Sequence, residues 1–482
     1  MEKTLDPGSD AEWGDLRALG HRMVDDMFNH LQGLRTTPAW EEQPASRRLR
    51  LEAEGVPRAA QDVSVVYESF LNDVLPYSAG NAHPRFFGWV QGNGTPLGML
   101  ADMLASGMNP HMAGFNQAPA VVEEQCLQWL AEMMGMPAGA SGLLTSGGTM
   151  ANLIGLTVAR HAKAGYDVRN QGVAGGPLLR VYCSSETHNW VRKAVELMGM
   201  GLVSLVSVPV EHGFEMDIAG LRSAIAADRA AGYRPVCVVG TAGTVNTGAT
   251  DDLEAIADVC AAEALWFHVD GAFGAMAYWV ESLRPALKGM ERADSLAFDL
   301  HKWGCLPFEV GCVLVRDAAA HTAAFATPAN YLTAMERGPA VGRMTFADRG
   351  IELTRGFKAL KVWMSLKTHG TDAIAAMVEQ NVAQARYLAR LVTREPELEL
   401  MAEVPLNIVC FRYRAADDAE NGEILLRVQE RGLAVPSSTL IGGRFAIRAA
   451  IVNHRSRRED FDALVEAVLM VGREVVSERV DG

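Results

Sequence analysis

The chain has 482 residues and an ordinary globular composition, 49% hydrophobic and 21% charged, and its formal net charge of −14 argues against a nucleic-acid partner. No segment approaches the ~18 uninterrupted apolar residues of a membrane span, so we expect no membrane partner. An acidic N-terminus without a signal layout, and seven cysteines without a CxxC pair, favour reduced thiols in a cytoplasmic protein.

Hydrophobic periodicity divides the chain into three regions. Residues 1–82 predict a helical segment, with apolar positions at helical spacing in 14–34. Residues 83–365 alternate strands with helices and predict a large α/β domain with a mainly parallel sheet. Its candidate strands are 178–185, 238–241, 265–270 and 311–317, and its helix at 250–264 has Thr250 or Asp251 as a plausible N-cap. Residues 366–482 predict a small α+β domain.

A lysine stands at the edge of an apolar run in "FDLHKWGCLPFEVGCVLVRD", residues 298–317. Lys302 raises a question, because lysine is rarely buried without a partner. An acid also stands at a predicted strand end, Asp270 in "LWFHVDGAFG". Ligands of open α/β sheets bind beyond the carboxyl ends of the strands, although an aspartate there can also cap a turn.

Two further features stand where predicted helices begin. In "LLTSGGTMANL" two glycines precede a helix, whose free N–H groups make a site for a phosphate, although such loops are common. In "SSETHNWVRKA" a strand passes into a helix through His188, which could also be a half-buried core residue. Together, a phosphate cradle, a strand-end acid and a core-edge lysine meet the requirements of pyridoxal phosphate.

The sequence resembles the pyridoxal-phosphate-dependent group II amino-acid decarboxylases, the family of aromatic-amino-acid and glutamate decarboxylases. The motifs that carry the resemblance are "HPRFFGW", "TSGGTMANL", "ETHNWVRKA", "GTAGTVNTGATDDLEAIA", "FHVDGAFG" and "FDLHKWGCLPFEVG", in the family's order over about residues 80–370. The resemblance implies the type I fold of PLP-dependent transferases. It also implies a homodimer, with the N-terminal segment, and 14–34 in particular, buried against the partner chain.

The resemblance also implies roles for individual residues. Lys302 matches the Schiff-base lysine, Asp270 the partner of the pyridine nitrogen, and His188 the histidine stacked on the ring. The other expected cofactor contacts are Gly148 and Thr149 at the phosphate, His301 beside it, Ala272 against the ring, and Thr244 and Asp299. Trp89, Val90, Gln91 and Arg355 are expected around the substrate, and no metal is expected.

This chain departs from the family's pattern at Gly271 and Phe273, at Asn189 and Trp190 where two serines are usual, and at Gly356. Trp190 puts bulk close to the ring stack. The implied reaction is decarboxylation of an L-amino acid to the amine and CO2. An aromatic substrate is favoured if Trp89 and Phe115 line the pocket, although either could equally be a core residue.

Several alternatives stay open for the reaction. They are an acidic substrate, another reaction on the same fold, a PLP-binding protein without turnover, and an aldehyde product formed with oxygen. The last depends on the proton donor, which in the family is a tyrosine on a loop after the lysine strand. In the corresponding stretch 327–355 the only tyrosine is Tyr331, and Phe346 or Arg349 stands where relatives carry theirs.

Overall fold

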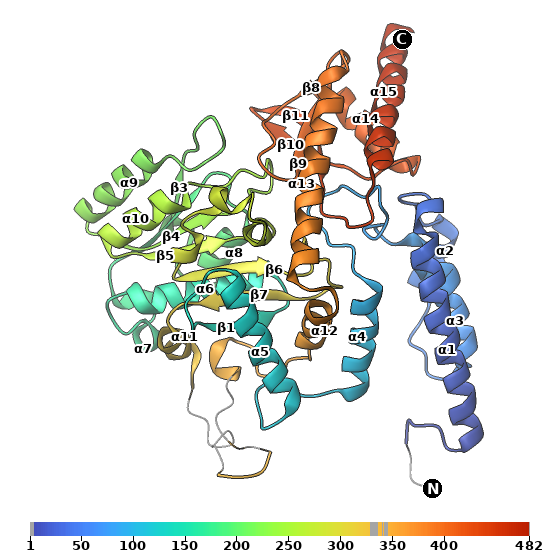
Figure 1. The fold of residues 1–482 in the computed structure, drawn as a ribbon, viewed down its shortest axis with the longest axis horizontal. Helices are drawn as coiled ribbons and strands as arrows, with labels where there is room; N and C mark the ends of the chain where they lie inside the picture. The colour runs from blue at the N-terminus through green and yellow to red at the C-terminus, as the bar shows by residue number, and fades with distance from the viewer. Residues whose placement is uncertain (1–3, 328–335, 340, 342–345, 482) are drawn as a thin grey trace.

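The computed structural model describes residues 4–327, 336–339, 341 and 346–481 (Figure 1). A seven-stranded sheet forms its centre, with the strand order β1-β7-β6-β5-β4-β2-β3. The strands are β1 (Ser141–Thr145), β2 (Leu179–Ser184), β3 (Leu205–Val208), β4 (Arg234–Thr241), β5 (Trp266–Asp270), β6 (Ser295–Asp299) and β7 (Gly311–Val315). Most are continuous apolar runs buried on both faces, as strands covered by helices must be.

The four strand regions predicted in this sheet are confirmed as β2, β4, β5 and β7. The sheet is parallel from β3 to β6, but β7 runs antiparallel to both of its neighbours. Only residues 300–310 connect β6 to β7, and a parallel pair needs a longer crossover. The mainly parallel sheet is therefore confirmed, with an exception that follows from one short connection.

Helices cover this sheet, and α6 crosses five of its strands. The helices between the N-terminal helices and the small domain are α4 (Pro96–Met108), α5 (Ala118–Met133), α6 (Gly148–Lys163), α7 (Val168–Gln171), α8 (Trp190–Leu197), α9 (Ile218–Ala230), α10 (Leu253–Glu263), α11 (Ala318–Phe325) and α12 (Ala359–His369). Asp252 caps α10 by accepting from the Ala255 N–H, so the predicted caps Thr250 and Asp251 are wrong. Asp251 is buried instead and accepts from the N–H groups of Met216 and Thr241.

The small domain is a four-stranded antiparallel sheet, ordered β10-β11-β9-β8, with three helices. Its elements are α13 (Thr371–Arg394), β8 (Leu398–Leu400), β9 (Ile408–Tyr413), α14 (Asp418–Glu430), β10 (Ser437–Ile441), β11 (Arg444–Ala450) and α15 (Arg458–Asp481). It has an apolar core of its own. None of the described helices is long and apolar enough to cross a lipid bilayer.

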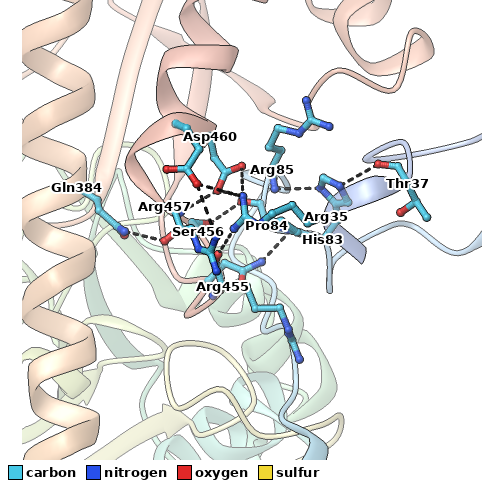
Figure 2. Close-up of polar contacts among 12 residues, drawn as sticks. Arg35, Thr37, His83, Pro84, Arg85, Gln384, Arg455, Ser456, Arg457 and Asp460 are labelled. Carbon is cyan, nitrogen blue, oxygen red and sulfur yellow. Dashed lines mark hydrogen bonds and ion pairs between the residues drawn. The ribbon is translucent and has the colours of Figure 1, made fainter. Parts of the chain in front are cut away.

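The N-terminal helices α1 (Asp10–Gly33), α2 (Ala45–Ala53) and α3 (Val63–Ser69) stand beside the rest of the chain (Figure 1). A polar cluster ties the chain after α1 to the small domain (Figure 2). Arg35 pairs with Asp460 at 2.9 Å, and Ser456 Oγ donates to the Pro84 carbonyl at 2.6 Å. The cluster therefore fixes where residues 83–85 lie, just before the 86–90 segment.

The 86–90 segment lies against the small sheet, far from it in sequence. The Phe87 N–H donates to the Val435 carbonyl, and the Ala450 N–H donates to the Phe87 carbonyl, both at 2.8 Å. Phe86 and Val435 form a parallel bridge. The predicted division at residues 82 and 365 stays a prediction, and α12 runs through the second position without a break.

Candidate functional site

A cavity of about 220 Å³ opens where β4 and β5 end, and Lys302, which comes shortly after β6 in the chain, lines it. This is the carboxyl end of the parallel strands, where α/β sheets bind ligands. The residues lining it are Trp89, Val90, Gly148, Thr149, Asn152, His188, Trp190, Thr241, Gly243, Val245, Asp270, Ala272, Phe273 and Lys302. The fold thus gathers side chains that are up to 213 residues apart, from Trp89 to Lys302, around one space.

Asp270 is the last residue of β5 and is 3% exposed. Its Oδ1 accepts from the Ala272 N–H at 3.1 Å, and its Oδ2 accepts from Trp190 Nε1 at 2.6 Å. Both carboxylate oxygens therefore have a protein donor, which fixes the orientation of the group at the cavity wall. A positioned buried carboxylate can hold a proton on a nitrogen atom of a ligand.

Lys302 lies three residues after the end of β6, and its side chain is 24% exposed. Its Nζ pairs with Asp299 Oδ2 at 2.8 Å. Asp299 is 1% exposed, and its Oδ1 is buried without a hydrogen-bond partner among the described residues. The amine is thus held at the cavity by one salt bridge, and the pair leaves one acceptor oxygen unused.

A second cavity, of about 620 Å³, lies at the start of α6 and shares Lys302 with the first. Gly148 and Thr149 line both cavities. The first turn of a helix leaves N–H groups without partners and carries a partial positive charge, which suits a phosphate. His301 also lines this cavity, and burial lowers the pKa of its imidazole, with Lys302 adding to the effect.

The glycines of this loop allow close packing. A Cβ atom on Gly148 would lie 2.8 Å from Asp299 Oδ2, and one on Gly147 would lie 3.2 Å from the His301 ring. Gly147 also has φ of +159°, at the edge of the range that L side chains rarely adopt. The loop therefore needs its glycines so that its backbone can approach Asp299 and His301.

His188 lies between β2 and α8 and lines the first cavity. Its Nδ1 accepts from the Trp190 N–H at 3.2 Å, which orients the ring. Burial lowers the pKa of the imidazole, and nearby Lys302 lowers it further, while Asp270 acts in the opposite direction. The histidine therefore favours its neutral form at neutral pH.

Besides Arg355, four of the expected site residues do not line the first cavity. Gln91 follows the two lining residues of the 86–90 segment, and Thr244 is fully buried, with its hydroxyl 3.0 Å from that of Thr247. Asp299 and His301 line only the second cavity. Phe115, considered as a possible pocket residue, is also absent from both linings.

Arg355 lies in the core, away from both cavities. Its guanidinium pairs with Glu123 and donates to the carbonyls of Met112 and Leu144, and the two charged side chains are 1% and 0% exposed. Burial raises the pKa of Glu123, while the guanidinium acts against that rise. We therefore leave Arg355 out of the substrate pocket that we propose below.

The residues considered as replacements for the loop tyrosine also point elsewhere. Phe346 is 2% exposed, and the guanidinium groups of Arg349 and Arg355 lie within 5.4 Å and 5.3 Å of its ring centre. Arg349 pairs with Glu124 at 2.9 Å. Neither residue lines the cavity at Lys302. Tyr331 lies outside the described residues.

The hydrogen bond between Trp190 and Asp270 is one feature that the sequence did not predict. The predicted effect of Trp190 was bulk near a ligand ring, whereas its indole N–H meets the carboxylate directly. A buried tryptophan usually finds an acceptor for its N–H, and this preference was the only available signal. Asn152, Thr241, Gly243 and Val245 also line the cavity without having been predicted.

The described residues fit pyridoxal phosphate. Lys302 supplies an amine at the junction of the two cavities, and Asp270 supplies a fixed carboxylate on the wall of the first. The start of α6 supplies N–H groups, and the glycine cradle leaves no room for a Cβ atom on Gly148. This donor set suits an aldehyde, a pyridine nitrogen and a phosphate together.

Comparison with known proteins gives a consistent result. Residues 46–414 match the family model described as pyridoxal-dependent decarboxylase conserved domain. The chain is 31% identical to an aromatic-L-amino-acid decarboxylase of Bacillus atrophaeus, over 96% of each chain. It is 30% identical to tryptophan decarboxylase 1 of Oryza sativa subsp. japonica, over 91% of this chain and 90% of that one. Its structure matches that of Oryza sativa TDC with PLP and tryptamine, with a TM-score of 0.88 and 28% identity over 98% and 99% of the two chains.

Proposed function

The chain belongs to the pyridoxal-dependent decarboxylase family, and we propose that its substrate is an aromatic L-amino acid. Pyridoxal 5′-phosphate is its cofactor and decarboxylation of an amino acid is its reaction. The observation that best supports an aromatic substrate is the indole of Trp89. This residue is 53% exposed and lies on the wall of the cavity that Lys302 lines. The names of the two relatives above, an aromatic-amino-acid and a tryptophan decarboxylase, also support it.

The proposed roles follow from the geometry. When bound, the cofactor supplies a conjugated ring that accepts the electron pair left when the carboxylate departs as CO2. Lys302 holds the cofactor through its amine, and Asp270, fixed by Trp190 and Ala272, holds a proton on the ring nitrogen. Gly148 and Thr149 bind the phosphate through the N–H groups at the start of α6, with His301 beside them.

His188 has two proposed tasks. Its ring lines the same cavity as Lys302, so it can cover one face of the cofactor. Burial lowers the pKa of its imidazole, and because Nδ1 accepts from the Trp190 N–H, the neutral ring carries its proton on Nε2 and can donate it from there. We propose Val90, beside Trp89, as a further substrate contact because it lines the cavity.

We propose a homodimer in the cytoplasm. No side chain of α1 is buried, and α3 exposes Val63, Val65 and Val66 at 48%, 56% and 52%. Burying these apolar side chains against a second chain would stabilise the assembly. All seven cysteines are unpaired and buried, which suits a reducing compartment. Light scattering should give twice the chain mass, and a fully active monomer would contradict the dimer.

Product analysis tests the proposed function. The purified enzyme with added cofactor is incubated with phenylalanine, tyrosine, tryptophan, glutamate and 2,4-diaminobutyrate, and CO2, amine, aldehyde and peroxide are measured. We expect CO2 and amine from the aromatic amino acids. Turnover confined to the acidic or the diamino acid would overturn the aromatic substrate, and aldehyde with peroxide would identify the oxidative outcome.

Lys302→Ala should abolish this turnover, because it removes the lysine amine that binds the cofactor. The matched control is Lys288→Ala, since Lys288 is an exposed lysine paired with Glu254 on another part of the surface. The control should keep wild-type activity. Turnover by Lys302→Ala at the wild-type rate would remove Lys302 from the mechanism.

A further inference from the structure

Trp89 has an unusual backbone for a tryptophan. Its φ is +50°, in the left-handed region that bulky L residues rarely adopt. Residues keep such a conformation only where the surrounding structure imposes it. The conformation matters here because Trp89 ends the part of the 86–90 segment that lies against the small sheet, and its indole lines the cavity at Lys302.

Two residues of the small domain bind the backbone of Trp89 from both sides. Ser437 Oγ, on β10, accepts from the Trp89 N–H at 3.0 Å. Arg448 Nη1, on β11, donates to the Trp89 carbonyl at 2.8 Å and to Ser437 Oγ at 3.1 Å. The two residues face one another in the β10–β11 register. Together they form a clamp, which we define as Ser437 and Arg448.

Burying the charged side chain of Arg448 in this position is energetically unfavourable. It is 3% exposed, and no carboxylate among the described residues pairs with it. Its Nη2 is buried without a partner among those residues, and burial lowers the pKa of the guanidinium to about 10. Its other contact is Nε to the Asn246 carbonyl at 3.3 Å. All of its side-chain hydrogen bonds therefore go to neutral oxygens, which are the Trp89 carbonyl, the Ser437 hydroxyl and the Asn246 carbonyl.

We propose that Arg448 is a specificity-positioning residue, which with Ser437 holds Trp89 in its left-handed conformation so that the indole forms a wall of the substrate pocket. Arg448 touches no substrate and acts only through Trp89. The inference rests on the proposed function, because an aromatic substrate gives the indole its use. It makes the small domain responsible for the shape of a pocket whose chemical groups belong to the large sheet.

A double-mutant cycle tests the proposal on the intact holoenzyme. Arg448→Lys keeps the charge but lacks the planar guanidinium, which bonds Trp89 and Ser437 through Nη1 while its Nε is held by the Asn246 carbonyl. With the aromatic substrate that the wild type prefers, we expect KM to rise on the order of tenfold while kcat stays close to wild type. Trp89→Ala should raise KM at least as much. The double variant should be no worse than Trp89→Ala alone, because Arg448 acts through that side chain.

Controls separate positioning from general stability. Arg444→Lys is the matched control, since Arg444 lies on the same strand but forms an exposed pair with Glu399. It should leave KM unchanged. The midpoint of thermal unfolding and the affinity for pyridoxal phosphate are measured for every variant. If Arg448→Lys does not fold, Ser437→Ala takes its place in the cycle, because it removes the acceptor of the Trp89 N–H.

Additive effects of the two substitutions, or an unchanged KM in Arg448→Lys and Ser437→Ala, would overturn the proposal. The proposed function fails separately, if the wild type converts no aromatic amino acid. The cycle is then measured with whichever amino acid the wild type does convert. Coupling between Arg448 and Trp89 would still support the clamp, and additivity would still overturn it.

Discussion

At the scale of single residues, the best-defined feature of the site is the set of hydrogen bonds to Asp270. A tryptophan indole and a backbone N–H each donate to one oxygen of the carboxylate. Trp190 is 2% exposed and also meets the His268 ring edge-on, with ring centres 5.8 Å apart. The carboxylate is therefore oriented by Trp190, at a position where the family resemblance led us to expect serine.

Trp190→Phe should keep the ring packing and remove the donor, which leaves Asp270 with one protein hydrogen bond. We expect kcat to fall on the order of tenfold or more, because a misplaced group costs rate steeply. Asp270→Asn should lower kcat by orders of magnitude. Trp279→Phe is the matched control, since the Trp279 N–H is buried without a partner among the described residues. Equal rates in Trp190→Phe and the control would contradict the role of the indole.

At the scale of elements, the start of α6 couples the proposed phosphate site to the strand that leads to Lys302. Gly148 packs on Asp299, the last residue of β6, with no room for a side chain between them. The start of the helix and the end of the strand are therefore packed directly against each other.

Gly148→Ala should weaken cofactor binding, because the new Cβ atom would lie 2.8 Å from Asp299 Oδ2 and must displace the loop or the carboxylate. We expect the Kd of pyridoxal phosphate, from an absorbance titration, to rise by on the order of tenfold or more. Gly107→Ala in α4 is the control, since its Cβ atom would meet nothing within 4 Å. An unchanged Kd in Gly148→Ala would refute the cradle.

At the scale of the whole molecule, buried histidines make the fold sensitive to acid. His268 is fully buried, bonded to Ser295 and Asn152 at 2.7 Å each, and burial lowers its pKa from 6.5 to about 3. Below pH 6.5 the unfolded chain binds a proton at His268, whereas the folded chain leaves the ring neutral down to about pH 3. The free energy of unfolding therefore falls as the pH drops through this window, by about 1.4 kcal/mol per pH unit for one such group.

Urea unfolding between about pH 7.5 and pH 5 checks this prediction. Wild type should lose stability towards the acid end. His268→Gln should be less stable at neutral pH but should show a shallower dependence on pH. His212→Gln, at an exposed histidine, should follow wild type. A slope in His268→Gln equal to that of wild type would contradict this role of His268.

The sequence by itself predicted most of the residues of the proposed site. Lys302, His188, Gly148 and Thr149 follow strands, Asp270 ends one, and each is marked by a short local motif. Such motifs are readable because the reason for each residue, a strand end or a helix start, lies within a few positions of it. The α/β architecture was predictable for the same reason, since apolar periodicity is a local property.

Only the tertiary structure decided which residues meet. Trp190 and Asp270 are 80 residues apart, and Arg448 and Trp89 are 359 apart. Arg355, expected near the substrate, pairs with Glu123 across 232 residues, and β7 reverses direction because its connection to β6 is short. No periodicity or spacing encodes such pairings, because packing of whole elements brings these side chains within hydrogen-bond distance. The positions of the groups that orient Asp270 and Trp89 are therefore properties of the fold.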